Sequence, residues 1–174
     1  MKIYIVRHGK TQYNIERRTT GHVDVPLVDE GIKEAIAEAK EAPKGIVKIY
    51  SSDLLRCKQT AEIFSEYLKV PIVYDARLRE RNFGTLDGHE IDALPEGMWQ
   101  KDIQQEYDYR QYGGESVDDV KKRFLSVLED IRHAHPEGNI LIVAHGGIVR
   151  LMQKMYLNAP ADKVHNSHIY EFDI

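Results

Sequence analysis

Residues 3–9 read IYIVRHG, and residues 140–147 read ILIVAHGG. Each stretch is a short apolar run of the kind that forms a buried strand, followed by a histidine and then by glycine. Ligands of open α/β sheets lie outside the carboxyl ends of the strands, and glycine there lets backbone N–H groups approach an anion closely. We therefore expect two adjacent strands that place His8 and His145 around one point.

The rest of the chain alternates between strand-like and helix-like patterns, which is typical of an α/β layered fold. Further strands are expected over 47–50, 71–74 and, at a closing edge, 169–173. Helices are expected after a cap at Asp29, over 54–68, after the Ser116–Asp119 capping box, and over 148–157 beyond a turn at 145–147. The stretch 75–114 is polar and irregular.

These elements predict a three-layer α/β/α sandwich with a mostly parallel central sheet. We expect one domain over residues 1–174, in which residues 85–112 form a lid-like insertion.

Composition excludes several classes of function. The formal net charge of −4 argues against nucleic-acid binding, which needs a basic face. No apolar run reaches the roughly 18 residues that cross a bilayer, and the first residues lack the pattern of a secretory signal. We therefore expect a cytoplasmic protein. The single cysteine, Cys57, rules out an internal disulfide and falls on an apolar helical stripe, where a core role is expected.

A third stretch supplies positive charge. Residues 51–61 read SSDLLRCKQTA and follow an expected strand. Arg56 then lies in the first turns of the next helix, on a flank away from its apolar stripe, and projects towards the carboxyl edge of the sheet. Together with Arg7 it offers two guanidinium groups, whose geometry suits bidentate binding of phosphate.

The same stretches resemble the histidine phosphatase superfamily, also called phosphoglycerate mutase-like. The family's blocks occur here in family order and span nearly the whole chain, whereas a single Arg-His-Gly tripeptide would be weak evidence. They are residues 7–9, 20–27, 51–61, 78–84, 113–116 and 144–146. The resemblance implies a phosphoglycerate mutase-like fold and an enzyme that acts on phosphate monoesters.

The resemblance also implies a role for each matched residue. His8 is the implied nucleophile that becomes phosphohistidine, and Glu80 is the implied general acid for the leaving oxygen. The implied cationic pocket around the phosphoryl oxygens consists of Arg7, Arg56 and His145. The positions implied to hold phosphate or substrate are Asn14, Gly21 and Gly146.

Phosphoryl transfer is catalysed mostly by positioning and charge stabilisation. Two arginines and a protonated His145 would supply that charge, so we expect neither a metal nor a cofactor. His8 must present a neutral nitrogen, and we expect its other N–H to donate to a backbone carbonyl. Glu80 must carry a proton when the ester oxygen leaves, so we expect burial to raise its pKa.

Structural roles are the alternative for several of these residues. Arg56 on its own would be a solvated helix residue. Glu80 stands among three arginines, so a surface ion-pair cluster is the alternative to catalysis; these are Arg77, Arg79 and Arg81. Four other histidines lack an accompanying zinc-ligand set and are expected in solvated loops, namely His133, His135, His165 and His168.

The chain departs from the mutases of the family between residues 85 and 112. In cofactor-dependent mutases this region is longer and carries basic residues that hold a second acidic group of the substrate. Here acids outnumber bases, which predicts repulsion of bisphosphates and phosphoglycerates. The acids are Asp87, Glu90, Asp92, Glu96, Asp102, Glu106 and Asp108, and the bases are Lys101 and Arg110. Aromatic residues that suit packing on a flat or apolar leaving group are Trp99, Tyr107, Tyr109 and Tyr112.

We therefore expect a metal-independent phosphomonoester hydrolase that forms a phosphohistidine on His8. We expect it to bind a small-molecule phosphate ester and to bind neither nucleic acid nor a membrane. The formation of a homodimer is left open. The small family members that it resembles include α-ribazole phosphatases and broad-specificity phosphatases. The alternatives are a cofactor-dependent phosphoglycerate mutase, a protein phosphohistidine phosphatase and a non-catalytic phospho-ligand module. Binding alone would need neither His8 nor Glu80, which argues against the last.

Overall fold

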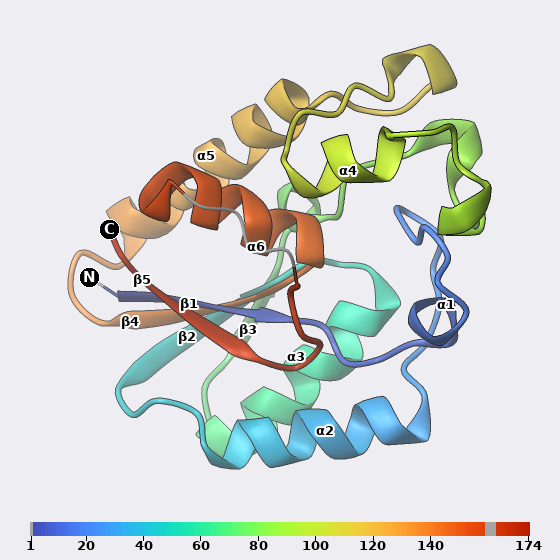
Figure 1. The fold of residues 1–174 in the computed structure, drawn as a ribbon. Helices are drawn as coiled ribbons and strands as arrows, with labels where there is room; N and C mark the ends of the chain where they lie inside the picture. The colour runs from blue at the N-terminus through green and yellow to red at the C-terminus, as the bar shows by residue number, and fades with distance from the viewer. Residues whose placement is uncertain (1, 159–162) are drawn as a thin grey trace.

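The computed structural model describes residues 2–158 and 163–174 and contains one five-stranded sheet with helices on both faces (Figure 1). The strand order is β3-β2-β4-β1-β5, and every pairing is parallel except that of β1 with β5. The predicted sandwich and closing edge strand are therefore confirmed. The strands are β1 (Lys2–Arg7), β2 (Ile46–Ser51), β3 (Ile72–Tyr74), β4 (Asn139–Ala144) and β5 (Ile169–Asp173).

Two helical layers cover the sheet. Figure 1 shows α2 and α3 below the sheet and α5 and α6 above it. The helices are α1 (Gln12–Ile15), α2 (Asp29–Lys40), α3 (Leu55–Leu68), α4 (Met98–Ile103), α5 (Val117–Ala134) and α6 (Gly146–Met152), which runs on into the π-helix η5 (Gln153–Leu157). Short 3-10 helices are η1 (Ala76–Leu78), η2 (Gly84–Leu86), η3 (Ile91–Ala93) and η4 (Arg110–Tyr112).

The central strands are apolar on both faces because both faces are covered. In β1, Ile3 and Ile5 belong to the apolar core on the α5–α6 side, whereas Tyr4 and Val6 belong to the core on the α2–α3 side. Residues of β4 alternate in the same way. The continuous apolar runs in the sequence thus serve two cores at once.

The register of the parallel strands fixes where the candidate residues lie. Arg7 pairs with Ala144, and the backbone N–H of His8 donates to the Ala144 carbonyl at 3.0 Å. On the other side of β4, Ser51 pairs with Val143. The chain therefore leaves β1, β4 and β2 at the same edge of the sheet.

Two local predictions are wrong. The expected turn at 145–147 does not form, because β4 leads through His145 as N-cap directly into α6, which begins at Gly146. Asp29 is not a cap either: Val28 occupies the N-cap position without a side-chain bond, and Asp29 lies in the first turn, where its negative charge favours the helix dipole. The capping box of Ser116 and Asp119 is confirmed.

The polar stretch after β3 is not featureless, since it contains α4 and all four 3-10 helices. Its residues 85–112, called the 85–112 segment below, pack against the loop after α1. Arg18 and Glu90 form an isolated β-bridge, and the Thr19 N–H donates to the His89 carbonyl at 2.9 Å. Within the described residues, no helix combines the length and apolar character needed to cross a membrane.

We expect the α5–sheet contact to carry much of the stability. Phe124 is fully buried in this contact, while its neighbour Leu125 is 39% exposed. Phe124→Ala should lower the free energy of unfolding by about 3–5 kcal/mol, because it removes buried surface and leaves a cavity. The matched control Leu125→Ala should cost about 1 kcal/mol or less. Urea denaturation measures both, and equal losses would contradict the assignment of this face.

Candidate active site

A cavity of about 870 Å³ opens at the carboxyl edge of the sheet. Its lining includes seven of the eight residues that the sequence singled out, and they come from loops and elements that are distant in the chain. These seven are Arg7, His8, Asn14, Gly21, Arg56, Glu80 and Gly146. The eighth, His145, lies behind the lining, with its ring centroid 5.3 Å from that of His8.

His8 is held as a neutral imidazole. Its Nδ1 lies 2.8 Å from the Gly9 carbonyl, so this nitrogen carries the proton and donates, which leaves the lone pair on Nε2. The turn itself is fixed because the Gly9 N–H donates to Thr60 Oγ1 at 3.0 Å. Burial, followed by the charge of Arg56, holds the pKa of His8 well below its ordinary value. The expected carbonyl partner is present.

His145 is neutral as well, contrary to the expectation that it is protonated. The Arg56 guanidinium donates to Nδ1 at 3.2 Å, so the proton sits on Nε2, which donates to Ser52 Oγ at 2.9 Å. Burial and the adjacent Arg56 charge hold the pKa of His145 well below its ordinary value. His145 therefore orients Arg56 in this state and does not itself supply positive charge.

Arg7 and Arg56 supply the positive charge. Arg56 is fully buried, not solvated on a helix flank, and it donates to the carbonyls of Gly21 at 2.8 Å and Val23 at 2.9 Å. Burial and the charge of Arg150 lower the pKa of Arg7 to about 10, so it is still charged at neutral pH. Within the described part of the chain, the Nε atoms of Arg7 and Arg56 have no hydrogen-bond partner.

Glu80 is only 8% exposed, which rules out the alternative of a surface ion-pair cluster. Of the three arginines near it in sequence, only Arg81 contacts its carboxylate, with NH1 2.8 Å from Oε1. Arg77 pairs with Asp75 and Asp130, and Arg79 pairs with Asp53.

The pKa of Glu80 is not raised as expected. Burial raises it, but the charge of Arg81 and hydrogen bonds from the backbone N–H groups of Gly147 and Arg81 outweigh burial and lower it to about 2. Glu80 is therefore ionised in this state. Gly147 is required here, because a Cβ at this position would collide with Glu80 and Arg81.

A second layer of polar contacts holds the lining in place. Asn14 completes the capping box of α1, whose N-cap is Thr11. Its Oδ1 accepts from the Thr11 N–H at 3.0 Å and from Asn166 Nδ2 at 3.2 Å, which directs the Asn14 NH₂ group away from these partners. Asn166 also donates to the His8 carbonyl at 2.9 Å. Sequence reasoning missed Asn166 because a lone asparagine before an edge strand carries no signal.

The family model of the histidine phosphatase superfamily (branch 1) matches residues 3–173. The chain belongs to this superfamily. Probable phosphoglycerate mutase GpmB of Escherichia coli (strain K12 / DH10B) is 37% identical to it over 165 residues, which cover 92% of this chain and 77% of the relative.

Solved structures of similar fold superpose over almost the whole chain. TTHB049 from Thermus thermophilus has a TM-score of 0.84 at 28% identity, with 99% of this chain and 94% of that chain covered. A mycobacterial glucosyl-3-phosphoglycerate phosphatase in complex with VO3 has a TM-score of 0.83 at 28% identity, with 98% and 91% covered.

The acidic 85–112 segment of this histidine phosphatase does not present its charge to the cavity. Every residue of the segment is described, and none of its seven carboxylates lines the cavity; Ile91 and Trp99 do. Several of the acids instead pair with bases, as Asp92 does with Arg17 and Asp102 with Arg81. The expected repulsion of acidic substrates by this segment is therefore not supported by its geometry.

We expect both site histidines to stay neutral in the folded protein at pH 6, because burial and Arg56 depress their pKa values. In the unfolded chain the same rings should be mostly protonated, since an ordinary histidine has a pKa of about 6.5. NMR of ¹⁵N-histidine, assigned with His8→Asn and His145→Asn, measures this with the urea-unfolded protein as reference.

The direction in which stability changes with pH follows from the unfolded state, because only the unfolded chain takes up protons on these two rings as the pH falls to about 6. The two neutral rings stabilise the fold above about pH 6.5, and this contribution is lost as the pH falls below that value. A folded-state titration of either ring near pH 6.5 would contradict the assignment.

Proposed function

We propose that this histidine phosphatase is a metal-independent phosphomonoester hydrolase that forms a phosphohistidine on His8. The observation that carries the proposal is the state of His8: a neutral ring with Nδ1 committed to the Gly9 carbonyl, beside the charged Arg7 and Arg56. We further propose that residues 1–174 act as one domain in which the 85–112 segment is the lid.

In the first step, His8 Nε2 forms a bond to phosphorus while the ester P–O bond breaks in line with it. Arg7 and Arg56 stabilise the charge on the three equatorial phosphoryl oxygens, which is the work that metal ions do in other phosphatases. Asn14 lines the same cavity, and its amide NH₂ donates to the same group in this proposal.

The leaving alkoxide takes a proton from the Glu80 carboxyl group. Glu80 is ionised before substrate binds, so a bound phosphate must change its proton affinity. A phosphate dianion next to the carboxylate raises its pKa by like-charge repulsion, and a monoanion, whose own pKa is about 6, brings a proton with it. In the second step Glu80 takes a proton from water, the water oxygen bonds to phosphorus, and the P–N bond to His8 breaks.

The proposed substrate is a small phosphate monoester whose leaving group has an apolar part. Ile91 and Trp99 are the contribution of the 85–112 segment to the cavity, and Phe83 lines it nearby. An α-ribazole phosphatase-like or broad-specificity activity fits these walls. One of the relatives is named a glucosyl-3-phosphoglycerate phosphatase, which supports hydrolysis as the reaction of this chain.

We expect a phosphoenzyme on His8. Rapid quench with ³²P-labelled substrate in the presence of a chelator should give protein-bound label that is acid-labile and alkali-stable, and His8→Ala should give none. The chelator is included because two arginines supply the positive charge. Label that survives acid, or label in the variant, would show that another residue is the nucleophile. Label that depends on an added divalent ion would overturn the metal-independent reaction.

Glu80→Gln should separate an acid catalyst from a structural carboxylate. The amide keeps the shape but has no acidic proton, so single-turnover transfer from an alkyl phosphate should slow on the order of 100-fold or more. Transfer from p-nitrophenyl phosphate should change much less, because its phenolate leaves without help. Equal, small losses for both substrates would exclude Glu80 as the acid.

A cofactor-dependent phosphoglycerate mutase is the second candidate, and it is favoured by the 37% identity to a probable phosphoglycerate mutase. Bases do line the rim of the cavity, but several have carboxylate partners: Lys10 with Glu30 at 2.7 Å, Arg17 with Asp92 at 3.1 Å, and Arg18 with Glu16 at 2.8 Å. Neither base of the 85–112 segment lines the cavity, although the whole segment is described.

We therefore expect hydrolysis to outrun mutase turnover. Conversion of 3-phosphoglycerate to 2-phosphoglycerate in the presence of 2,3-bisphosphoglycerate should be much slower than hydrolysis of the best monoester in a substrate panel. Lys10, Arg17 and Arg18 of the rim are already paired with carboxylates, so they offer a second acidic group little net attraction. A mutase turnover of about 10 per second or more would favour the second candidate.

A further inference from the structure

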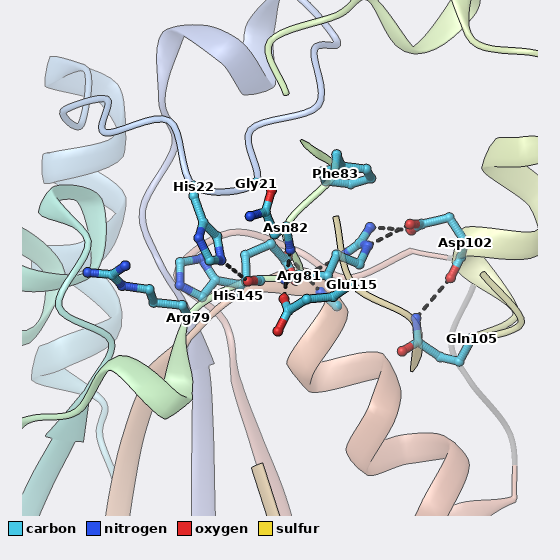
Figure 2. A network of polar contacts seen from close by, with 12 residues as sticks. Gly21, His22, Arg79, Arg81, Asn82, Phe83, Asp102, Gln105, Glu115 and His145 are labelled. Carbon is cyan, nitrogen blue, oxygen red and sulfur yellow. Dashed lines mark hydrogen bonds and ion pairs between the residues drawn. The ribbon is translucent and has the colours of Figure 1, made fainter. Parts of the chain in front are cut away.

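Arg81 lies between the candidate acid and the 85–112 segment. It is 2% exposed and contacts two carboxylates, Glu80 and Asp102, of which Asp102 is fully buried in α4. Two aromatic rings cover the guanidinium, with the centroid of Phe83 at 4.7 Å and that of Tyr107 at 5.4 Å. Figure 2 shows the guanidinium facing the Asp102 carboxylate, and the backbone carbonyl of Asp102 accepting from Gln105.

Asp102, and not Glu80, orients the guanidinium. Arg81 Nε donates to Asp102 Oδ2 at 2.5 Å, and NH2 donates to Oδ1. Tyr109 holds the same carboxylate by donating to Oδ2 at 2.8 Å. The remaining nitrogen, NH1, lies 2.8 Å from Glu80 Oε1, but within the described part of the chain it makes no well-directed hydrogen bond. The side chain of Arg81 therefore acts on Glu80 through its charge.

The electrostatic effect of Arg81 on Glu80 depends on Asp102. Arg81 next to a buried carboxylate favours the ionised form, and a second carboxylate on the far side of Arg81 offsets that effect. Burial lowers the pKa of Arg81, but the charges of Asp102 and Glu80 outweigh burial and hold it well above its ordinary value. Without Asp102, an uncompensated cation would stand against the candidate acid.

The same helix also reaches the cavity. Trp99 lines the cavity and precedes Asp102 by three residues in α4, so the two side chains share one side of the helix. A leaving group packed on Trp99 would thus contact the helix that holds Arg81. The position of the leaving group and the supply of a proton from Glu80 are therefore connected through α4.

We propose that Arg81 is a positioning residue for the proton of Glu80, and that docking of Asp102 from α4 onto Arg81 enables Glu80 to hold that proton for the leaving group. The proposal rests on the proposed function, in which Glu80 is the acid. It gives the 85–112 segment a part in catalysis beyond covering the cavity.

Other ionisable groups also face Glu80. Arginines near its carboxylate, besides Arg81, are Arg7 of β1, Arg56 of α3 and Arg150 of α6. The backbone carbonyl of Glu80 is contacted by His22 and by Arg123, which lies in α5. Its carboxylate also interacts electrostatically with Cys57 of α3, Tyr107 and Asp102. Among these groups Asp102 is an acid that is bound to Arg81 and lies outside the cavity lining, so its substitution leaves the phosphate-binding arginines in place.

The test compares Asp102→Asn with Asp108→Asn. Asp108 is also in the 85–112 segment and also pairs with an arginine, Arg110, but on the surface. Single-turnover transfer to His8 is measured against pH with glycerol 3-phosphate and with p-nitrophenyl phosphate. An acid catalyst loses activity as the pH rises through its pKa, so a lower pKa moves this loss to lower pH.

With glycerol 3-phosphate, we expect the single-turnover rate of Asp102→Asn to fall at a pH about one unit lower than in the wild type. At pH values above both transitions, the rate of the variant should then be about tenfold lower than that of the wild type. Transfer from p-nitrophenyl phosphate should change by less than about twofold, since it needs little proton transfer. Asp108→Asn should match the wild type with both substrates. Tyr109→Phe, which removes only the hydrogen bond to Asp102, should give a smaller shift in the same direction.

An unmoved pH profile in Asp102→Asn, or equal losses with both substrates, would overturn the proposal and leave Arg81–Asp102 as a structural ion pair. If Asp102→Asn does not fold, Tyr109→Phe decides in the same way. Wild-type protein that forms no phosphoenzyme on His8 would overturn the proposed function and this proposal with it. If the wild type forms the phosphoenzyme but the pH profile of Asp102→Asn is unmoved, this proposal alone is overturned.

Discussion

The parallel pairing of β1 with β4 is the constraint on which the site depends. Pairing Arg7 with Ala144 sends both chains over the same edge of the sheet, so that the rings of His8 and His145 come within 5.3 Å. A shift of the register by one residue would exchange the two faces of β1 and expose its core side chains to the wrong helical layer. The position of His8 is thus tied to the packing of Ile3 and Ile5.

The burial of charged groups determines the protonation states of His8, His145 and Glu80. Several cations lie close together in a region of low dielectric, and the two imidazoles respond by staying neutral, which leaves His8 able to act as a nucleophile. Glu80 responds in the opposite way and stays ionised. In the proposed reaction, the charge balance of such a site favours a doubly charged phosphate, because its negative charge compensates the arginines and raises the proton affinity of the carboxylate.

The sequence predicted what depends on local patterns and little of what depends on tertiary contact. Apolar runs of strand length predicted all five strands, and the family's blocks predicted the residues around the cavity. The burial of Arg56 was missed because its carbonyl partners, Gly21 and Val23, are distant in the chain.

The direction of the Glu80 pKa shift was missed for a related reason. It depends on Arg81, whose position is fixed by Asp102, a residue that looked like one more surface acid of a polar stretch. Glycine in the first turn of a helix also misled the prediction: Gly147 reads as a turn, but it lies in α6, and its lack of a side chain allows the close approach of Glu80.

The sheet order also bears on how the protein is made. Strand β1 pairs with β4 and β5, which lie more than a hundred residues later in the chain. During translation the strand that leads to His8 is therefore made before both of its neighbours, by an interval on the order of ten seconds at ordinary elongation rates. The candidate site is not assembled in that interval, so the nascent chain gains the ability to react with cellular phosphate esters only after β4 has been synthesised.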